Sequence, residues 1–274
     1  MHRHGRIGSG TFRIDNTVEV IMKFKHAITR VPGENFAQGI TTSDLGSPDY
    51  KRILEQHRAY INTLKYLGLQ VLELEALVDF PDAYFLEDTA VVLPEIAIIT
   101  NPGAVARKGE AIAIEPVLSG FRQIVRIKPP GTVDGGDVLQ LNKHLFMGIS
   151  QRTNIEGAEQ IRQIVSKFGY DVALITVEAG LHLKSSVNYL GKDTLLVTQD
   201  FAKLDSFKPF DRIVVDSSEE YAANTLWIND TLITPKGFPN TKRKLEDLGL
   251  PIIDLDISEA RKMDGGLTCM SLRF

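Results

Sequence analysis

Residues 47–74, SPDYKRILEQHRAYINTLKYLGLQVLEL, encode a helix, a helix stop and a strand in immediate succession. Ser47 and Pro48 are typical of a helix N-cap and a first helical position. Gly68 ends the predicted helix because glycine adopts a left-handed backbone at little cost. The apolar residues 71–74 predict the strand that follows. Within the helix, the side chains at intervals of three and four residues share one face: Tyr50, Ile53, Leu54, His57, Ile61 and Leu64.

The same order of helix, turn and strand returns four more times. The turns fall near positions 68, 120, 169, 209 and 249. Successive turns are therefore 52, 49, 40 and 40 residues apart. Only the turn near 209 lacks a glycine. Repeats of this length indicate supersecondary units that bury their apolar faces against one another. The strands expected after the later turns are 124–127, 172–175, 213–215 and 252–255, and short strand pairs are expected at 90–93 with 97–100, 138–141 with 145–149 and 226–229 with 231–234.

This pattern predicts an α/β fold in which five repeats close into a ring. A five-bladed α/β propeller of ββαβ-type repeats around a central channel would also protect the edges of the sheets. An ordinary α/β sheet with coincidental spacing is the alternative.

Composition narrows the classes of function. The chain has 274 residues with 31 Lys and Arg against 35 Asp and Glu, a formal net charge of −4, so no overall basic field attracts it to nucleic acid or an anionic membrane. The single cysteine excludes an intramolecular disulfide and suits a reducing cytoplasm. The chain contains neither Gly-x-Gly-x-x-Gly nor a Walker A motif, which disfavours the common nucleotide sites. We interpret residues 1–21 as an extra leader and 22–274 as a single domain.

The segments after the repeated strands are unusually rich in reactive side chains. They carry acidic residues at 82–88, Asp134, His182, Asn224 and Cys269. If the repeats are equivalent, these segments point toward a common axis. A thiol, an imidazole and a carboxylate would there supply a nucleophile, a general base and a group that orients the base. Taken singly, the cysteine and the histidine are also typical of a packed core, and Asp-Gly pairs are typical of turns.

The remaining charges suggest a substrate with two charged ends. Asp82, Glu87 and Asp88 would select a cation, and a planar guanidinium donates paired hydrogen bonds to carboxylates. Arg107 and Arg152, 45 residues apart, each lie between an apolar strand and a helix and would hold a substrate carboxylate. For either arginine alone, a surface salt bridge is the competing interpretation. A ligand with a guanidinium at one end and a carboxylate at the other is arginine or an N-substituted arginine.

The motifs resemble those of the dimethylarginine dimethylaminohydrolase family, which belongs to the pentein superfamily of guanidino-group-modifying enzymes. The resemblance runs from about residue 23 to 274 and rests on six segments: 80–88, 101–107, 134–137, 150–154, 181–184 and 266–269. It implies a pentein catalytic domain that hydrolyses methylated arginines to citrulline and an alkylamine through a covalent S-alkylthiouronium intermediate on cysteine. The leader has no counterpart in that family.

The resemblance also implies individual roles. Cys269 matches the nucleophile, His182 the general acid and base, and Asp134 the acidic partner. Arg107 and Arg152 match ligands of the substrate carboxylate, and Asp82, Glu87 and Asp88 match the substrate-binding carboxylates. The backbone near Ile40 and Met263 corresponds to positions that hold the α-amino group. No metal or organic cofactor is expected.

Three other functions remain open at this point. An arginine deiminase-type enzyme would use the same groups on unmethylated arginine and would release ammonia. A non-catalytic interaction protein with this fold would lack the reactive groups, and a binding protein for basic amino acids would leave the cysteine without a role. We expect a small-molecule substrate and neither nucleic acid nor membrane as a partner. A homodimer is left open.

Overall fold

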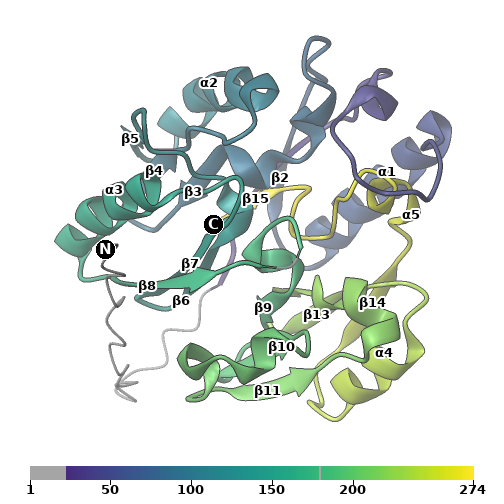
Figure 1. Cartoon of the computed structure of the whole chain (residues 1–274). Helices are drawn as coiled ribbons and strands as arrows, with labels where there is room; N and C mark the ends of the chain where they lie inside the picture. Colours follow the sequence, from purple (N-terminus) through teal and green to yellow (C-terminus); the bar gives the residue numbers. More distant parts are fainter. Residues whose placement is uncertain (1–22, 179) are drawn as a thin grey trace, which may run out of the picture.

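Five three-stranded sheets stand around a common centre, and the α-helices lie on the outside of the ring (Figure 1). The computed structural model describes residues 23–178 and 180–274; the expected leader, residues 1–21, lies outside them. The chain builds the second to fifth sheets in sequence order, whereas the first also contains the C-terminal strand, and strands of several neighbouring sheets contact one another. This arrangement confirms the five-bladed α/β propeller.

Each blade follows the predicted order of two antiparallel strands, a crossover and a parallel third strand. In the second blade, β3 (Ala90–Val92) pairs with β4 (Ile96–Ile99), and helix α2 (Lys108–Ser119) leads to β5 (Gln123–Arg126). The crossover is needed because a parallel neighbour must start at the same end of the sheet. The third blade contains β6 (Val138–Leu141), β7 (His144–Ile149), α3 (Ile155–Val165) and β8 (Asp171–Thr176), and the fifth contains β12 (Leu226–Ile228), β13 (Thr231–Pro235), α4 (Pro239–Glu246) and β14 (Ile252–Leu255).

The first blade joins the two ends of the described chain. The C-terminal strand β15 (Leu272–Arg273) pairs antiparallel with β1 (His26–Arg30), which pairs parallel with β2 (Gln70–Leu74). Helix α1 (Tyr50–Tyr66) forms the crossover and contacts the short helix α5 (Ser258–Arg261). The ring is therefore closed by backbone hydrogen bonds between segments more than two hundred residues apart.

The fourth blade departs from the pattern at the turn that lacks a glycine. Only residues 198–210 separate β10 (Thr194–Val197) from β11 (Asp211–Val214), and they form two 3₁₀ turns instead of an α-helix. β9 (Val187–Tyr189) completes the sheet. Phe201, Phe207 and Phe210 pack into the core from this short segment and replace the apolar face of a helix.

One local prediction needs correction. Helix α1 begins at Tyr50 rather than at Pro48, because the Asp49 side chain caps it by accepting a hydrogen bond from the Arg52 N–H at 2.8 Å. Gly68 has the expected left-handed backbone, with φ of +91°, but Gly120 has φ of −73° and stays in the right-handed region.

Burial is highest in the middle strands. All residues of β4 and β10 are buried, whereas the outer strands β5 and β11 each have exposed residues. The middle strand is covered by a neighbouring strand on each side, and the sheets pack against one another and against the helices. The core consists of clusters between blades, which fixes the blades relative to the centre of the ring.

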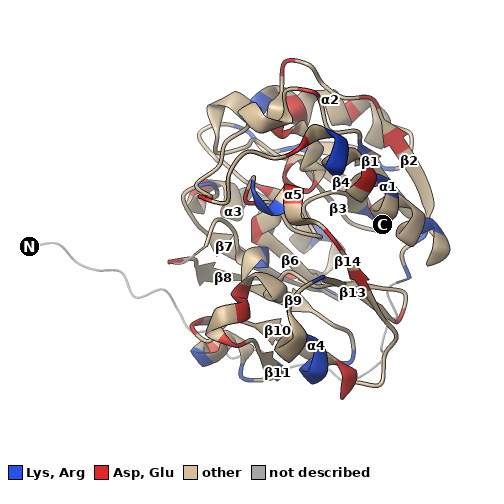
Figure 2. Ribbon diagram, turned by 90° about the vertical axis from the view of Figure 1, so that its right-hand side faces the viewer, with Lys and Arg blue, Asp and Glu red and all other residues tan. Residues whose placement is uncertain are grey.

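Charged residues of both signs are interspersed on helices and loops, as Figure 2 shows, in keeping with the small net charge. Within the described part of the chain, none of the helices has the length and apolar character needed to cross a membrane.

Tyr60 ties helix α1 to the C-terminal segment that closes the ring. Its buried hydroxyl donates to the Leu267 carbonyl at 3.0 Å and lies 2.7 Å from Ser271 Oγ. Tyr60→Phe should lower the free energy of unfolding by about 1–3 kcal/mol, because it leaves buried polar partners unpaired. Urea unfolding measures the change, and Tyr66→Phe, at a side chain that is 82% exposed, is the matched control. Equal losses in the two variants would contradict a role for the Tyr60 hydroxyl in closing the ring.

Candidate active site

Segments that follow the outer strands of several blades converge on one small cavity of about 30 Å³. Asp134 lies outside this cavity, behind His182, and Glu87 faces a different one. The other eight residues expected at the site line it together: Ile40, Asp82, Asp88, Arg107, Arg152, His182, Met263 and Cys269.

His182 is held by the carboxylate expected to orient it. It follows β8 in extended backbone at the start of a 3₁₀ turn, so it lies in a loop and not in a core strand. Its Nε2 lies 3.1 Å from Asp134 Oδ2, and the other oxygen of Asp134 accepts the Gly103 N–H at 2.9 Å. The contact fixes the imidazole ring because the carboxylate itself is fixed and fully buried.

Three carboxylates make His182 a strong base. Burial lowers the pKa of its imidazole, but Asp88, Asp134 and Asp137 outweigh burial and raise the pKa to about 9. Asp137 also accepts the Leu183 N–H at 2.9 Å, which anchors the turn that carries the histidine. At neutral pH the ring is therefore protonated and ready to donate a proton to a leaving group.

Two glycines let the loop of Cys269 approach its neighbours closely. A Cβ atom on Gly265 would lie 2.1 Å from the Phe85 ring, and one on Gly266 would lie 2.5 Å from the amide group of Asn224. The glycine pair thus permits a close backbone approach in the loop from which Cys269 lines the cavity.

The thiol of Cys269 lies in a negative environment. Burial raises its pKa, Glu87 and Asp88 raise it further, and the Gly266 N–H and the Thr268 hydroxyl oppose them, with a resulting pKa of about 12. The unliganded site therefore holds a neutral thiol. A cation bound beside the sulfur would offset these carboxylates and favour the thiolate, which is the reactive species.

Asp88 links the histidine to the arginine cluster. One of its oxygens accepts the Gly136 N–H at 2.9 Å and lies 3.9 Å from His182 Nε2, and the other accepts from Arg107 at 2.6 Å. Burial raises the pKa of this carboxyl, but His182, Arg107 and the backbone donor outweigh burial and lower it to about 2. Asp88 therefore stays ionised across the physiological range.

Arg107 is more tightly held than the sequence interpretation assumed. Its guanidinium pairs with Asp88 at 2.6 Å and with Glu110 at 2.8 Å, and it donates to the carbonyls of Phe85 and Asp82 at 2.9 and 3.3 Å. Nearly all of its N–H groups are thus committed within the protein, and the side chain is buried. In this structure Arg107 organises the acidic segments around the cavity.

Arg152 differs from Arg107, although the two were predicted to be equivalent. It also lines the cavity, but among the described residues its guanidinium has no hydrogen-bonded partner. Its main chain is fixed by close contact with Gly103, where a Cβ atom would lie 2.3 Å from the Arg152 carbonyl oxygen. Arg152 is therefore the arginine whose donors are available to an incoming carboxylate.

The rim of the cavity is built by the segment around Ile40. The backbone N–H of Ile40 donates to both oxygens of Asp82 at 3.1 Å, and the Thr42 N–H donates to Asp264 at 2.5 Å. Met263 is buried directly beneath, while Ile40 is 41% exposed. The two positions expected to contact an α-amino group thus lie together at the rim.

Glu87 points away from the cavity that contains Cys269, unlike its neighbour Asp88. Its Oε1 pairs with Lys184 at 2.7 Å and with Arg273 at 2.9 Å, and its Oε2 accepts the Thr268 hydroxyl at 2.8 Å. In this structure Glu87 acts on the site through its charge and through Thr268, which precedes Cys269.

Sequence reasoning missed several of these partners. Glu110 lies three residues after Arg107 on the same helix face, which was a usable signal. Lys184 lies within a motif that had been singled out, without a role being assigned to it. Thr268 also lies within such a motif, 266–269, without a role being assigned to it. Arg273 gave no local signal, because only the closed ring brings it to Glu87.

The cluster around His182 also has the ligand types of a metal site. Atoms of Asp88, Asp134 and His182 lie within 4.8 Å of one another. However, the oxygens of Asp88 already accept from Arg107 and from the Gly136 N–H. The guanidinium thus supplies the positive charge that balances this carboxylate, and the arrangement suits proton transfer better than metal coordination.

Known proteins match the chain over most of its length. A model of the arginine deiminase family matches residues 76–208. The N(G),N(G)-dimethylarginine dimethylaminohydrolase of Pseudomonas aeruginosa is 42% identical over 253 residues, which cover 92% of this chain and 100% of that protein.

Solved structures give the same result. The Pseudomonas aeruginosa dimethylarginine dimethylaminohydrolase, as a cysteine-to-serine variant complexed with citrulline, superposes with a TM-score of 0.91 at 41% identity, covering 92% of this chain and 100% of that one. A histidine-to-glycine variant of a dimethylarginine dimethylaminohydrolase, as an adduct with S-methyl-L-thiocitrulline, has a TM-score of 0.90 at 42% identity, with the same coverage. By this identity over nearly the whole length, the chain belongs to the dimethylarginine dimethylaminohydrolase family.

Proposed function

We propose that this protein hydrolyses N-omega-methylated arginines to citrulline and methylamine or dimethylamine. The observation that carries the proposal is the single cavity in which Cys269, His182 and Asp88 meet the guanidinium of Arg152, which has no hydrogen-bonded partner among the described residues. The carboxylate suits the cationic end of the substrate, and the guanidinium suits its carboxylate end. Related proteins complexed with citrulline and with a thiocitrulline adduct support the same substrate class.

The first half of the reaction transfers the guanidino carbon to sulfur. Binding of the guanidinium beside Asp88 offsets the negative field at Cys269, so the thiol loses its proton to solvent. The thiolate forms a bond to the guanidino carbon, and the bond from that carbon to the alkylated nitrogen breaks. The imidazolium of His182 donates its proton to the departing amine, and Asp134 holds the ring in position.

The second half returns the enzyme to its starting state. The imidazole of His182, now neutral, takes a proton from a water molecule, whose oxygen attacks the S-alkylthiouronium carbon. The carbon–sulfur bond breaks and its electron pair returns to Cys269, while the new hydroxyl group loses its proton to solvent and becomes the carbonyl of citrulline. After citrulline leaves, the thiolate takes a proton from solvent, which restores the neutral thiol of the unliganded site. Both proton transfers thus use one residue, and the raised pKa of His182, about 9, favours its acid form at the start.

Arginine deimination is a second candidate, favoured by the match of residues 76–208 to the arginine deiminase family. The same groups would attack unmethylated arginine and release ammonia. Incubation with asymmetric dimethylarginine, monomethylarginine and arginine, with both products identified, separates the two functions. Citrulline and ammonia from arginine alone would overturn our proposal.

We also propose that residues 22–274 work as one catalytic domain in the cytoplasm. The proposal is supported by the closure of the ring between β1 and β15 and by the use of a single, reduced cysteine at the cavity.

Substitutions distinguish the role of the proposed nucleophile from that of the proposed acid and base. Cys269→Ser should leave almost no citrulline formation, because a serine hydroxyl is barely ionised near neutral pH. His182→Ala should lower kcat by about 10²–10⁴-fold while binding persists. Steady-state citrulline assays and equilibrium binding of dimethylarginine measure the two effects. Near-native turnover of Cys269→Ser would exclude the covalent route.

The two arginines should respond differently to the same substitution. Arg152→Met should raise KM by about tenfold or more and leave the fold intact, since a charge-assisted contact to the substrate is lost. Arg107→Met should lower the free energy of unfolding by about 3–5 kcal/mol, because Asp88 and Glu110 lose their buried partner. Kinetics and urea unfolding of both variants test the distinction. A stable Arg107→Met protein with only a KM defect would show that Arg107 acts mainly on the substrate.

The reactivity of the thiol should depend on Glu87. In the unliganded enzyme the rate of Cys269 alkylation by iodoacetamide should rise about tenfold per pH unit between pH 7 and 9, because the thiol titrates far above that range. Glu87→Gln removes a negative charge, so it should lower the thiol pKa and accelerate alkylation at pH 7.

Glu220→Gln, at an exposed residue, is the matched control. Cys269 is the single cysteine, so mass spectrometry follows one product. An unchanged or slower rate in Glu87→Gln would contradict the electrostatic assignment.

A further inference from the structure

A second cavity lies behind the active site and shares no lining residue with it. Its volume is about 140 Å³. The two cavities meet at one wall, because three pairs of consecutive residues contribute one member to each: Glu87 and Asp88, Lys184 and Ser185, and Thr268 and Cys269. The first member of every pair faces the second cavity, which we call the rear cavity.

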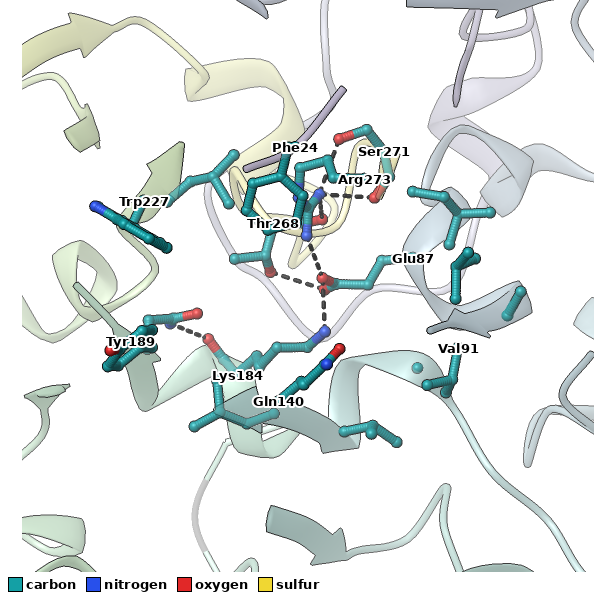
Figure 3. Close-up of a pocket in the computed structure, with 18 of the residues that line it drawn as sticks. Phe24, Glu87, Val91, Gln140, Lys184, Tyr189, Trp227, Thr268, Ser271 and Arg273 are labelled. Carbon is teal, nitrogen blue, oxygen red and sulfur yellow. Dashed lines mark hydrogen bonds and ion pairs between the residues drawn. The ribbon is translucent and has the colours of Figure 1, made fainter. Parts of the chain in front are cut away.

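The floor of the rear cavity carries an unbalanced positive charge. Lys184 and Arg273 both pair with the single carboxylate of Glu87, at 2.7 and 2.9 Å (Figure 3). The side chains of Lys184 and Arg273 are only 13% and 11% exposed. Two cations against one carboxylate leave this group with a charge of 2 − 1 = +1.

This excess charge favours an anion. A charge removed from bulk water is costly unless a partner compensates it, and here one carboxylate serves two cations. The Lys184 ammonium has three N–H donors, and the described residues give it one hydrogen-bond partner, Glu87 Oε1. Its remaining donors are available to a ligand in the cavity (Figure 3).

The walls of the rear cavity combine polar groups, among them Gln140 and Asn188, with an apolar part. Val91, Val138 and Leu226 line its sides, and the aromatic rings of Phe24 and Trp227 face it as well. A ligand that suits both the floor and the walls has one negative group and a short apolar chain. The volume of about 140 Å³ leaves room for a chain of a few carbon atoms.

We propose that the rear cavity binds a short-chain aliphatic carboxylate, with its carboxylate on Lys184 and its chain against the apolar wall. The proposal is independent of the proposed function, because no residue of this cavity lines the cavity that contains Cys269.

Trp227 provides the readout, since it is the single tryptophan of the chain and lines the rear cavity. Its fluorescence is recorded while sodium butyrate is added to the full-length protein, with ionic strength held constant by sodium chloride. Butyrate should produce a saturable change. Butyramide, which has nearly the same shape without the charge, and chloride alone should produce none.

Three variants separate the rear cavity from the active site. Lys184→Met should weaken butyrate binding by about tenfold or more, because a charge-assisted hydrogen bond is lost. Arg152→Met, which removes the unpaired cation of the active site, should bind butyrate as the wild type does. Lys203→Met, at an exposed lysine, is the matched control for the substitution itself.

Several outcomes would overturn the proposal. Equal responses to butyrate, butyramide and chloride would show that the cavity does not select a carboxylate. Loss of the response in Arg152→Met with retention in Lys184→Met would place the ligand in the active site. If Lys184→Met fails to fold, Lys184→Arg should retain binding within a few-fold. The contrast between butyrate and butyramide on the wild type needs no variant, and its absence also refutes the site.

Discussion

The site depends on the pairing of β1 with β15, which closes the ring. Cys269 lies three residues before β15, so the register of this two-residue strand determines where the thiol points. The Tyr60 hydroxyl, which bonds the carbonyl of Leu267, holds the same segment from helix α1. A closed ring also forces the loops of all blades to the same centre, which is why groups from four blades meet there without being near in sequence.

At this centre the charge of each group influences the protonation state of its neighbours. Arg107 balances Asp88 and Glu110, Asp88 and Asp134 keep His182 protonated, and the same acidic surroundings keep the thiol neutral. The unliganded enzyme therefore holds a protonated imidazole and a neutral thiol, which in the mechanism that we propose are the acid and the nucleophile. A guanidinium supplies the missing positive charge, so the electrostatics that select the substrate also activate the attack on it.

The wall between the two cavities explains why adjacent residues have different roles. Extended or tightly turned backbone directs consecutive side chains to opposite sides, so residues 87–88, 184–185 and 268–269 each serve both cavities. Glu87, Lys184 and Thr268 form a hydrogen-bonded layer directly behind Cys269. Only this layer of side chains separates the rear cavity from Cys269. A change of charge in that cavity therefore alters the electrostatic potential at the thiol.

The sequence by itself determined the repeat, the order of elements in most blades and the candidate reactive groups, because these follow from apolar periodicity, from turn residues and from motifs that are local in the chain. The sequence did not show that Arg107 is held by protein carboxylates and Arg152 is not. It also did not show that Glu87 and Asp88 face different cavities. Those assignments depend on partners such as Arg273, 186 residues from Glu87, and on which side of a loop each side chain faces. Only the tertiary structure decides them, because a side chain's hydrogen bonds and burial are set by segments distant in sequence that the closed ring brings together.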